Sequence, residues 1–243
     1  MSDYDRAMNK VASCFLLAIT IAHAPSLGYA ENPAESLKVY AATVTKTTPF
    51  SKPFTGFAIY LGRGEVISAA HVIGRWPFFI YLKVNIAGLE LPAELIKIGS
   101  SESIDIALLK VDETKLPVSL RLRLNPLCTT APAVGEEVFG VVPDKVVRTQ
   151  IASPQSTPQN YRERYGTLVP SVVTLSGSGI FRGKTKCLLG IMSRSIQRFK
   201  YWPEGQLYIP DGAAGYFVPS TQIIQFLGIK VTSPKSTPLS FDH

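Results

Sequence analysis

Ser68-Ala69-Ala70-His71-Val72 is a short apolar stretch that we expect to end a buried strand, Glu65–His71. It carries the one histidine placed well inside the sequence, because His23 lies in an apolar N-terminal segment and His243 is the last residue. Histidine is the side chain whose charge changes near neutral pH. Chemistry that needs a protein imidazole to move a proton therefore has one candidate here, His71.

Two later segments carry the other polar groups of interest. Asp105 lies in Ser103-Ile104-Asp105-Ile106-Ala107-Leu108-Leu109-Lys110, and Ser176 lies in Leu175-Ser176-Gly177-Ser178-Gly179-Ile180-Phe181. An ionised carboxylate among apolar residues must find a partner, because its burial without one is costly. A serine hydroxyl becomes a nucleophile when an imidazole takes its proton and a carboxylate orients that imidazole. The order His, Asp, Ser is one known layout of such a triad.

The rest of the sequence is dominated by short β-branched and aromatic runs divided by turn residues, a spacing that favours antiparallel barrels or sandwiches. A connector at about residues 112–130 separates two such series. We expect strands at Lys38–Val44, Gly56–Leu61, Glu65–His71, Phe78–Val84, Leu89–Ile98 and Asp105–Val111, then at Glu137–Val142, Val146–Ala152, Val169–Val173, Gly179–Phe181, Lys186–Ser193 and Gly215–Val218.

Two local patterns give finer expectations. Leu61-Gly62-Arg63-Gly64-Glu65 predicts a tight hairpin that leads into the strand ending at His71. Ser220–Leu227 predicts one C-terminal helix, with Ser220 as its N-cap and an apolar face.

The N-terminus has the pattern of a secretory signal peptide over residues 1–30. Arg6 and Lys10 precede an apolar stretch, residues 11–22, and the small-residue site Gly28-Tyr29-Ala30 precedes Glu31. We expect export to the periplasm or secretion, with no stable membrane span after cleavage. The alternative is an uncleaved amphipathic or membrane anchor.

Charge and cysteine content narrow the classes of function. The formal net charge is +7, but the basic residues are scattered, so we expect no specific nucleic-acid partner. No Cys-x-x-Cys or His-x-x-x-His spacing occurs, so we expect no metal. Cys128 and Cys187 follow the leader, and this even number permits one disulfide in an exported protein; two buried free thiols are the alternative.

The three polar segments resemble the motifs of the trypsin-like (chymotrypsin-fold) serine proteases, particularly the short exported bacterial ones. Ser-Ala-Ala-His71 is similar to that family's histidine motif, Asp105-Ile-Ala-Leu-Leu to its aspartate motif, and Ser176-Gly-Ser-Gly-Ile-Phe to its nucleophile motif. The likeness covers about residues 39–227. Choosing Ser178 as the nucleophile would place Ser176 where the family has glycine, so Ser176 is the better match.

The resemblance implies an all-β fold of two antiparallel six-stranded barrels with a short C-terminal helix. The protease domain would span residues 31–229, with lobes at about 37–115 and 131–219 and a flexible tail at 230–243. The implied activity is a serine endopeptidase that forms an acyl-enzyme on protein or peptide substrates through His71, Asp105 and Ser176, without a cofactor. The sequence assigns no oligomeric state.

The resemblance also places the groups that would bind substrate. The backbone N–H groups of Thr174 and Ser176 would form the oxyanion hole. The substrate pocket would involve Pro170, Ser193, Arg194, Ser195 and Gly215, and since none of these is acidic, we expect small or apolar residues on the acyl side of the cut. The family usually has Gly-Asp or Gly-Asn where this chain has Thr174-Leu175. This departure keeps open a catalytically weak or inactive homologue that binds peptides or an envelope partner.

Overall fold

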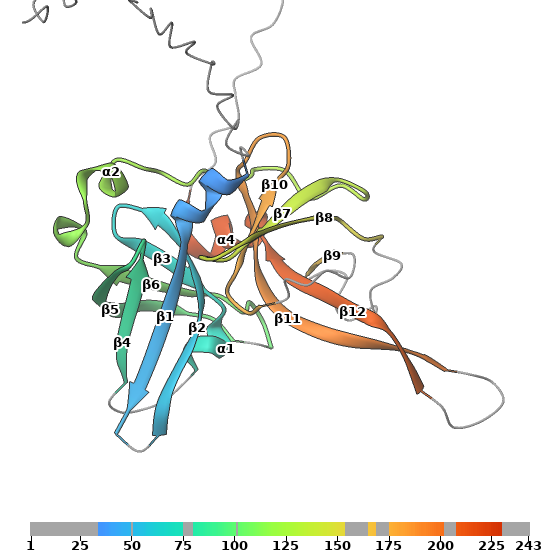
Figure 1. Cartoon of the computed structure of the whole chain (residues 1–243), viewed down its shortest axis with the longest axis horizontal. Helices are drawn as coiled ribbons and strands as arrows, with labels where there is room; N and C mark the ends of the chain where they lie inside the picture. The colour runs from blue at the N-terminus through green and yellow to red at the C-terminus, as the bar shows by residue number, and fades with distance from the viewer. Residues whose placement is uncertain are drawn as a thin grey trace, which may run out of the picture. The chain divides into compact units, whose positions relative to one another are not determined.

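The computed structural model describes residues 34–49, 51–74, 80–100, 102–153, 165–168, 175–201 and 208–229, and for residues 167–168, 196–201 and 208–214 it describes the backbone alone (Figure 1). The predicted leader, residues 1–30, the tail, residues 230–243, and the predicted strand Val169–Val173 lie outside the described residues. None of the helices in these ranges is long and apolar enough to cross a membrane.

The first half of the described chain forms a closed antiparallel barrel in the order β1-β2-β3-β6-β5-β4. Alternate side chains of these strands fill its interior, where Val44, Tyr60, Val84 and Leu109 are fully or almost fully buried. The strands are β1 Ala41–Thr48, β2 Ser51–Gly62, β3 Glu65–Ser68, β4 Tyr81–Ile86, β5 Leu89–Ile98 and β6 Ala107–Val111. The six-stranded first barrel expected from the sequence is confirmed.

The turn between β2 and β3 is the tight hairpin that the sequence predicts. Gly62 pairs with Glu65, so Arg63 and Gly64 form a two-residue connection. Both have positive φ, 52° and 73°. This is the backbone geometry of the turns that match the right-handed twist of the flanking strands.

The second half forms a six-stranded antiparallel sheet in the order β8-β7-β10-β11-β12-β9. Its strands are β7 Glu137–Val141, β8 Val146–Gln150, β9 Gly166–Leu168, β10 Gly179–Arg182, β11 Leu188–Tyr201 and β12 Tyr208–Pro219. In Figure 1, β11 and β12 run together as a long ribbon that projects beyond the other strands. Strand content and the single C-terminal helix confirm the all-β class.

The C-terminal helix α4 spans Ser220–Leu227, as predicted, but its predicted cap is wrong. Pro219 occupies the N-cap position, while the Ser220 hydroxyl donates a 2.6 Å hydrogen bond to the Cys128 carbonyl oxygen. The other end of α4 contacts the first barrel, because the Lys97 ammonium donates to the Phe226 carbonyl and lies 4.5 Å from the centre of its ring. A cation at a helix C-terminus is favourable for the helix dipole.

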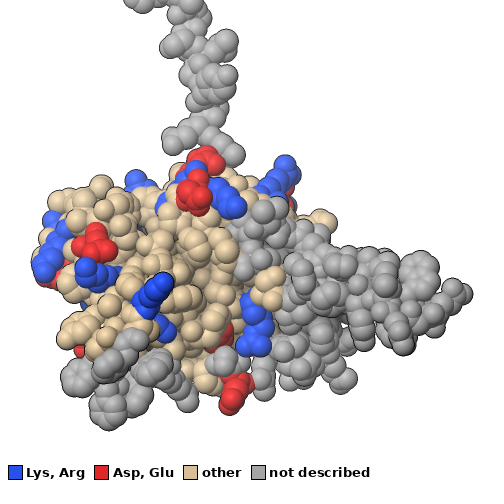
Figure 2. Space-filling view, turned by 60° about the horizontal axis from the view of Figure 1, so that its bottom comes forward, with Lys and Arg blue, Asp and Glu red and all other residues tan. Residues whose placement is uncertain are grey.

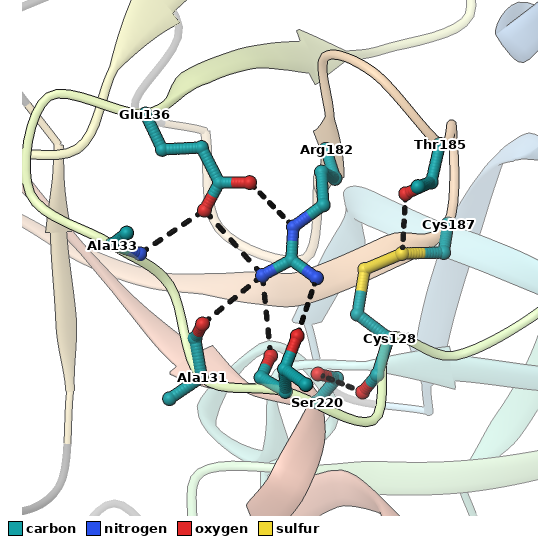
Figure 3. A network of polar contacts seen from close by, with 9 residues as sticks. Cys128, Ala131, Ala133, Glu136, Arg182, Thr185, Cys187 and Ser220 are labelled. Atoms are coloured by element: carbon teal, nitrogen blue, oxygen red, sulfur yellow. Dashed lines mark hydrogen bonds and ion pairs between the residues drawn. A yellow bond between two sulfur atoms is a disulfide. The ribbon is translucent and has the colours of Figure 1, made fainter.

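The connector is attached to the second sheet by a disulfide and an arginine (Figure 3). It contains η2 Glu113–Lys115 and α2 Val118–Arg121. Cys128 and Cys187 are joined across 59 residues; for a loop of that length the chain-entropy model gives about 4 kcal/mol of stabilisation. The Arg182 guanidinium donates to the Thr130 hydroxyl at 2.7 Å and to Glu136 at 2.5 Å. These contacts hold the connector's end against β10.

Positive charge is dispersed over the surface that Figure 2 presents. Lysine and arginine side chains stand apart from one another among uncharged residues, with acidic side chains between several of them. On this face the described basic side chains form no continuous stripe.

Candidate active site

His71 lies in a helical turn and not at the end of a strand. The predicted strand Glu65–His71 stops at Ser68, and His71 belongs to α1, Ala70–Ile73. The His71 backbone N–H donates to Asp105 Oδ1 at 2.9 Å, so it takes no part in a strand ladder. Its side chain is 39% exposed. The turn therefore presents the imidazole at the surface next to a buried carboxylate.

Asp105 holds the imidazole in one orientation. The Asp105 side chain is fully buried, and its Oδ2 lies 2.7 Å from His71 Nδ1. An ionised carboxylate can only accept hydrogen bonds, so the proton is placed on Nδ1 and Nε2 is left as the acceptor. That is the tautomer a general base needs if it is to take a proton at Nε2.

The loop before β6 requires glycine to bring Asp105 to this place. Gly99 N–H donates to the Ile106 carbonyl at 2.8 Å, which closes the loop around Asp105. A Cβ atom at Gly99 would lie 2.0 Å from the Ile104 carbonyl oxygen. Any larger residue would have to push the Asp105 segment away from His71.

Ser193 contributes to this site in a way that the sequence analysis missed. The prediction placed Ser193 on the pocket wall alone, but its buried hydroxyl donates to Asp105 Oδ2. It follows the largely apolar run 188–192 along β11. A small hydroxyl residue at the point where a buried strand leaves the core was the available signal, but nothing in the sequence links it to a residue 88 positions earlier.

These contacts decide the ionisation of Asp105. Burial alone raises the pKa of a carboxyl group, but the hydrogen bonds from the His71 ring, the Ser193 hydroxyl and the His71 backbone together outweigh it. The pKa of Asp105 is therefore lowered below its ordinary value. The carboxylate stays charged in the folded protein at any pH near neutrality.

A pH dependence of stability follows from this lowered pKa. A carboxyl whose pKa is depressed by folding stabilises the protein above its unfolded pKa, about 4, and loses that contribution as the pH falls through the folded pKa. We expect the difference in unfolding free energy between the natural protein and Asp105→Asn to shrink as the pH falls from about 6 to about 2. Urea unfolding at a series of pH values measures it. If the difference in unfolding free energy between the two proteins did not change with pH, the lowered pKa of Asp105 would be contradicted.

Ser176 lies at the junction of the barrel and the second sheet. Its carbonyl oxygen accepts the Phe57 N–H of β2 at 3.3 Å, and the next residue's N–H donates to the Met192 carbonyl of β11 at 2.8 Å. That residue is Gly177, with φ of 87°, where a Cβ atom would lie 1.9 Å from the Phe57 carbonyl oxygen. Only glycine fits between the two strands, and this fixes the position of Ser176.

The Ser176 hydroxyl is bonded to Ser193 in this structure. It donates to the Ser193 carbonyl oxygen at 3.1 Å, and no hydrogen bond joins it to His71 among the contacts of the described residues. Ser193 thus contacts two of the predicted triad residues, Asp105 through its hydroxyl and Ser176 through its carbonyl. Ser176 is partly exposed.

The second candidate nucleophile, Ser178, is placed differently. It is fully buried, and its hydroxyl has no hydrogen-bond partner among the described residues. A substrate carbonyl would not reach this hydroxyl without opening the core. The position favours Ser176 over Ser178.

The remaining predicted site residues divide into two groups. Thr174 and Pro170 lie outside the described residues, so the predicted oxyanion hole and pocket floor remain predictions. Ser193, Arg194 and Ser195 follow one another on β11, and Gly215 of β12 pairs with Ser195. The structure therefore brings these four residues together, and Ser193 among them contacts Ser176, while their role in substrate binding stays a prediction.

His71 also lines a cavity of about 360 Å³. Its walls come from α1 and from the loop that precedes Asp105: Ala70, His71, Gly74, Ile98, Gly99, Ser100 and Glu102. Within the described residues, no group of histidine, cysteine and acidic side chains could hold a metal ion.

Comparison with known proteins identifies the fold. No protein-family model and no curated protein sequence matches the chain. Among solved structures, the active form of the Rv3671c protease from M. tuberculosis is 16% identical, with a TM-score of 0.57 over 84% of this chain and 86% of that one. A serine endoprotease from Yersinia pestis is 18% identical, with a TM-score of 0.54 over 79% and 62% of the two chains.

A mammalian structure gives the same result. Neuropsin, a serine protease from mouse brain, is 14% identical, with a TM-score of 0.55 over 79% of this chain and 93% of that one. The chain therefore has the chymotrypsin fold of the trypsin-like serine proteases.

Proposed function

We propose that this protein is an exported serine endopeptidase in which Ser176 is the nucleophile, His71 the general base and Asp105 the residue that orients His71. One observation carries the proposal: a fully buried carboxylate binds Nδ1 of a partly exposed imidazole at 2.7 Å. Burying an ionised group needs strong compensation, and here the imidazole, a backbone N–H and a hydroxyl provide it. Export is proposed from the N-terminal pattern alone.

The chemistry assigned to these residues is acyl transfer. As the Ser176 oxygen bonds to the substrate carbonyl carbon, its proton moves to His71 Nε2, and Asp105 stabilises the imidazolium that forms. The imidazolium then gives that proton to the departing amine as the C–N bond breaks, leaving an ester on Ser176. Water attacks the ester with His71 again as base and releases the carboxylic acid. No step needs a cofactor.

Two further assignments come from the sequence. The β11 segment containing Ser193, Arg194 and Ser195 is proposed to bind the acyl side of the substrate, with Gly215 opposite it and Pro170 as the floor. Thr174 and Ser176 are proposed to donate their N–H groups to the oxyanion. The absence of an acidic residue from this set favours small or apolar side chains before the cut.

The alternative function is a catalytically weak or inactive homologue that binds peptides or an envelope partner in the same cleft. The observation that favours it is the hydrogen bond from the Ser176 hydroxyl to the Ser193 carbonyl, which engages the nucleophile away from His71. If the protein is a peptidase, the Ser176 hydroxyl turns to His71 when substrate enters.

A fluorophosphonate probe separates the two functions. Purified protein beginning at Glu31 should be labelled at Ser176, because the probe requires an activated serine. His71→Ala should prevent labelling while leaving the circular dichroism spectrum unchanged. Absence of labelling in folded natural protein would favour the binding homologue.

A further inference from the structure

The hairpin half of β2 has an open edge beside the candidate active site. β2 pairs with β1 from Ser51 to Ile59, whereas β3 pairs with it only from Ile59 onward. From residue 51 to residue 58, therefore, no described strand pairs with the second edge of β2. The side chains from Ser51 to Thr55 are exposed. Figure 1 shows this half of the hairpin running past α1, the element that carries His71.

The backbone groups along this edge can be assigned from one residue. Phe57 directs its N–H to the Ser176 carbonyl and its carbonyl to the Ser68 hydroxyl, so both groups point away from β1. Alternate residues of an antiparallel strand point to the same side. Thr55 therefore presents its N–H and carbonyl to the open edge. Thr45 and Thr55 thus face each other without backbone hydrogen bonds between them, and their side-chain hydroxyls are hydrogen-bonded at 3.0 Å.

The open edge belongs to a cationic hairpin. No aspartate or glutamate occurs from Ala41 to Arg63, while Lys46 and Lys52 flank the turn. Lys46 pairs across the strands with Phe54, whose ring is 5.7 Å from its ammonium and is 52% exposed. Neither lysine has an ion pair with a described carboxylate. The hairpin thus offers an aromatic surface and two positive charges to whatever lies along the edge.

We infer that this edge binds the substrate segment that follows the cut, and that Lys46 and Lys52 select acidic residues there. The inference depends on the proposed peptidase function, with the acyl side bound along β11. Ser176 lies between the two strands, bonded to Ser193 of β11 and to Phe57 of β2. A substrate held by β11 before the cut therefore meets β2 after it. Extended peptides add readily to open strand edges.

The direction of the chain gives the register. β2 runs toward Ser176, and the leaving segment runs away from it, so the two pair antiparallel. The substrate residue opposite Thr55 receives two backbone hydrogen bonds. The residue opposite Phe54 lies on the face that carries Lys46, because cross-strand neighbours share a face. The β1–β2 register shifts between Phe54 and Ser51, so Lys52 acts farther from the cut, toward the turn, without a fixed spacing from that residue. Acidic residues are selected at the position opposite Phe54 and at one position beyond it.

A substrate scan tests this inference. Peptides with one common acyl-side sequence carry a single glutamate, or a single lysine, at each of the six positions after the cut. We expect glutamate to raise kcat/KM about two- to fivefold over lysine at two positions, the one opposite Phe54 and one farther from the cut, as for exposed ion pairs. The effect should be larger at an ionic strength of about 0.01 M than at about 1 M.

Charge reversal supplies the control. Lys52→Glu should reverse the preference at the outer of the two positions, while Lys184→Glu, an equal change of charge in the turn beyond the far end of β10, should leave the scan unchanged. A flat scan, or equal effects of the two variants, would overturn the inference. A chromogenic ester that ends at the scissile bond tests the peptidase activity separately: if the natural protein does not hydrolyse it, the proposed function fails.

Discussion

Ser176→Ala should lower kcat for peptide hydrolysis by about a million-fold, which is the scale of losing the nucleophile of a serine protease triad. The change removes the oxygen that would carry the acyl group. It should leave the fold intact, because the hydroxyl is partly exposed and has one hydrogen bond, to the Ser193 carbonyl. Steady-state hydrolysis of a peptide substrate and fluorophosphonate labelling both measure the loss.

The matched control is Ser178→Ala, two residues away. The Ser178 hydroxyl is buried without a partner among the described residues, so its removal should cost no hydrogen bond and leave both activity and stability close to those of the natural protein. Activity that survives Ser176→Ala and disappears in Ser178→Ala would transfer the nucleophile to Ser178.

Asp105→Asn should lower kcat by about ten-thousand-fold through the wrong tautomer of His71. Asp105 Oδ1 accepts the His71 backbone N–H, so an asparagine keeps its oxygen at this position and places its NH₂ group where Oδ2 now faces the imidazole. The amide would then donate to Nδ1, and the ring proton would move to Nε2. A base protonated at Nε2 cannot accept the proton of Ser176.

The control for this change is Asp112→Asn. Asp112 caps the turn that contains Thr114, outside the candidate site, and its carboxylate accepts the Thr114 N–H at 3.0 Å. The substitution alters the same chemical group, so we expect kcat to stay the same. A kcat of Asp105→Asn equal to that of the natural protein would remove Asp105 from the mechanism.

Much of the fold can be predicted from local sequence. β5 and α4 have the predicted bounds, because alternation in Leu89–Ile98 and the apolar face of Ser220–Leu227 are properties of neighbouring residues. The turn at Arg63-Gly64 follows from its need for positive φ. The order His71, Asp105, Ser176 is also visible in the sequence alone, and the proposed chemistry starts from it.

What the sequence by itself determined is thus the strand series, the hairpin, the final helix and the identity of three candidate side chains. Only the tertiary structure decided how they meet. His71 lies outside its predicted strand because its backbone N–H donates to the Asp105 carboxylate. The Ser220 hydroxyl donates to the Cys128 carbonyl oxygen instead of capping its helix. Ser193 reaches Asp105 across 88 residues. Such contacts depend on the packing of distant strands, and no local preference of either residue specifies its partner.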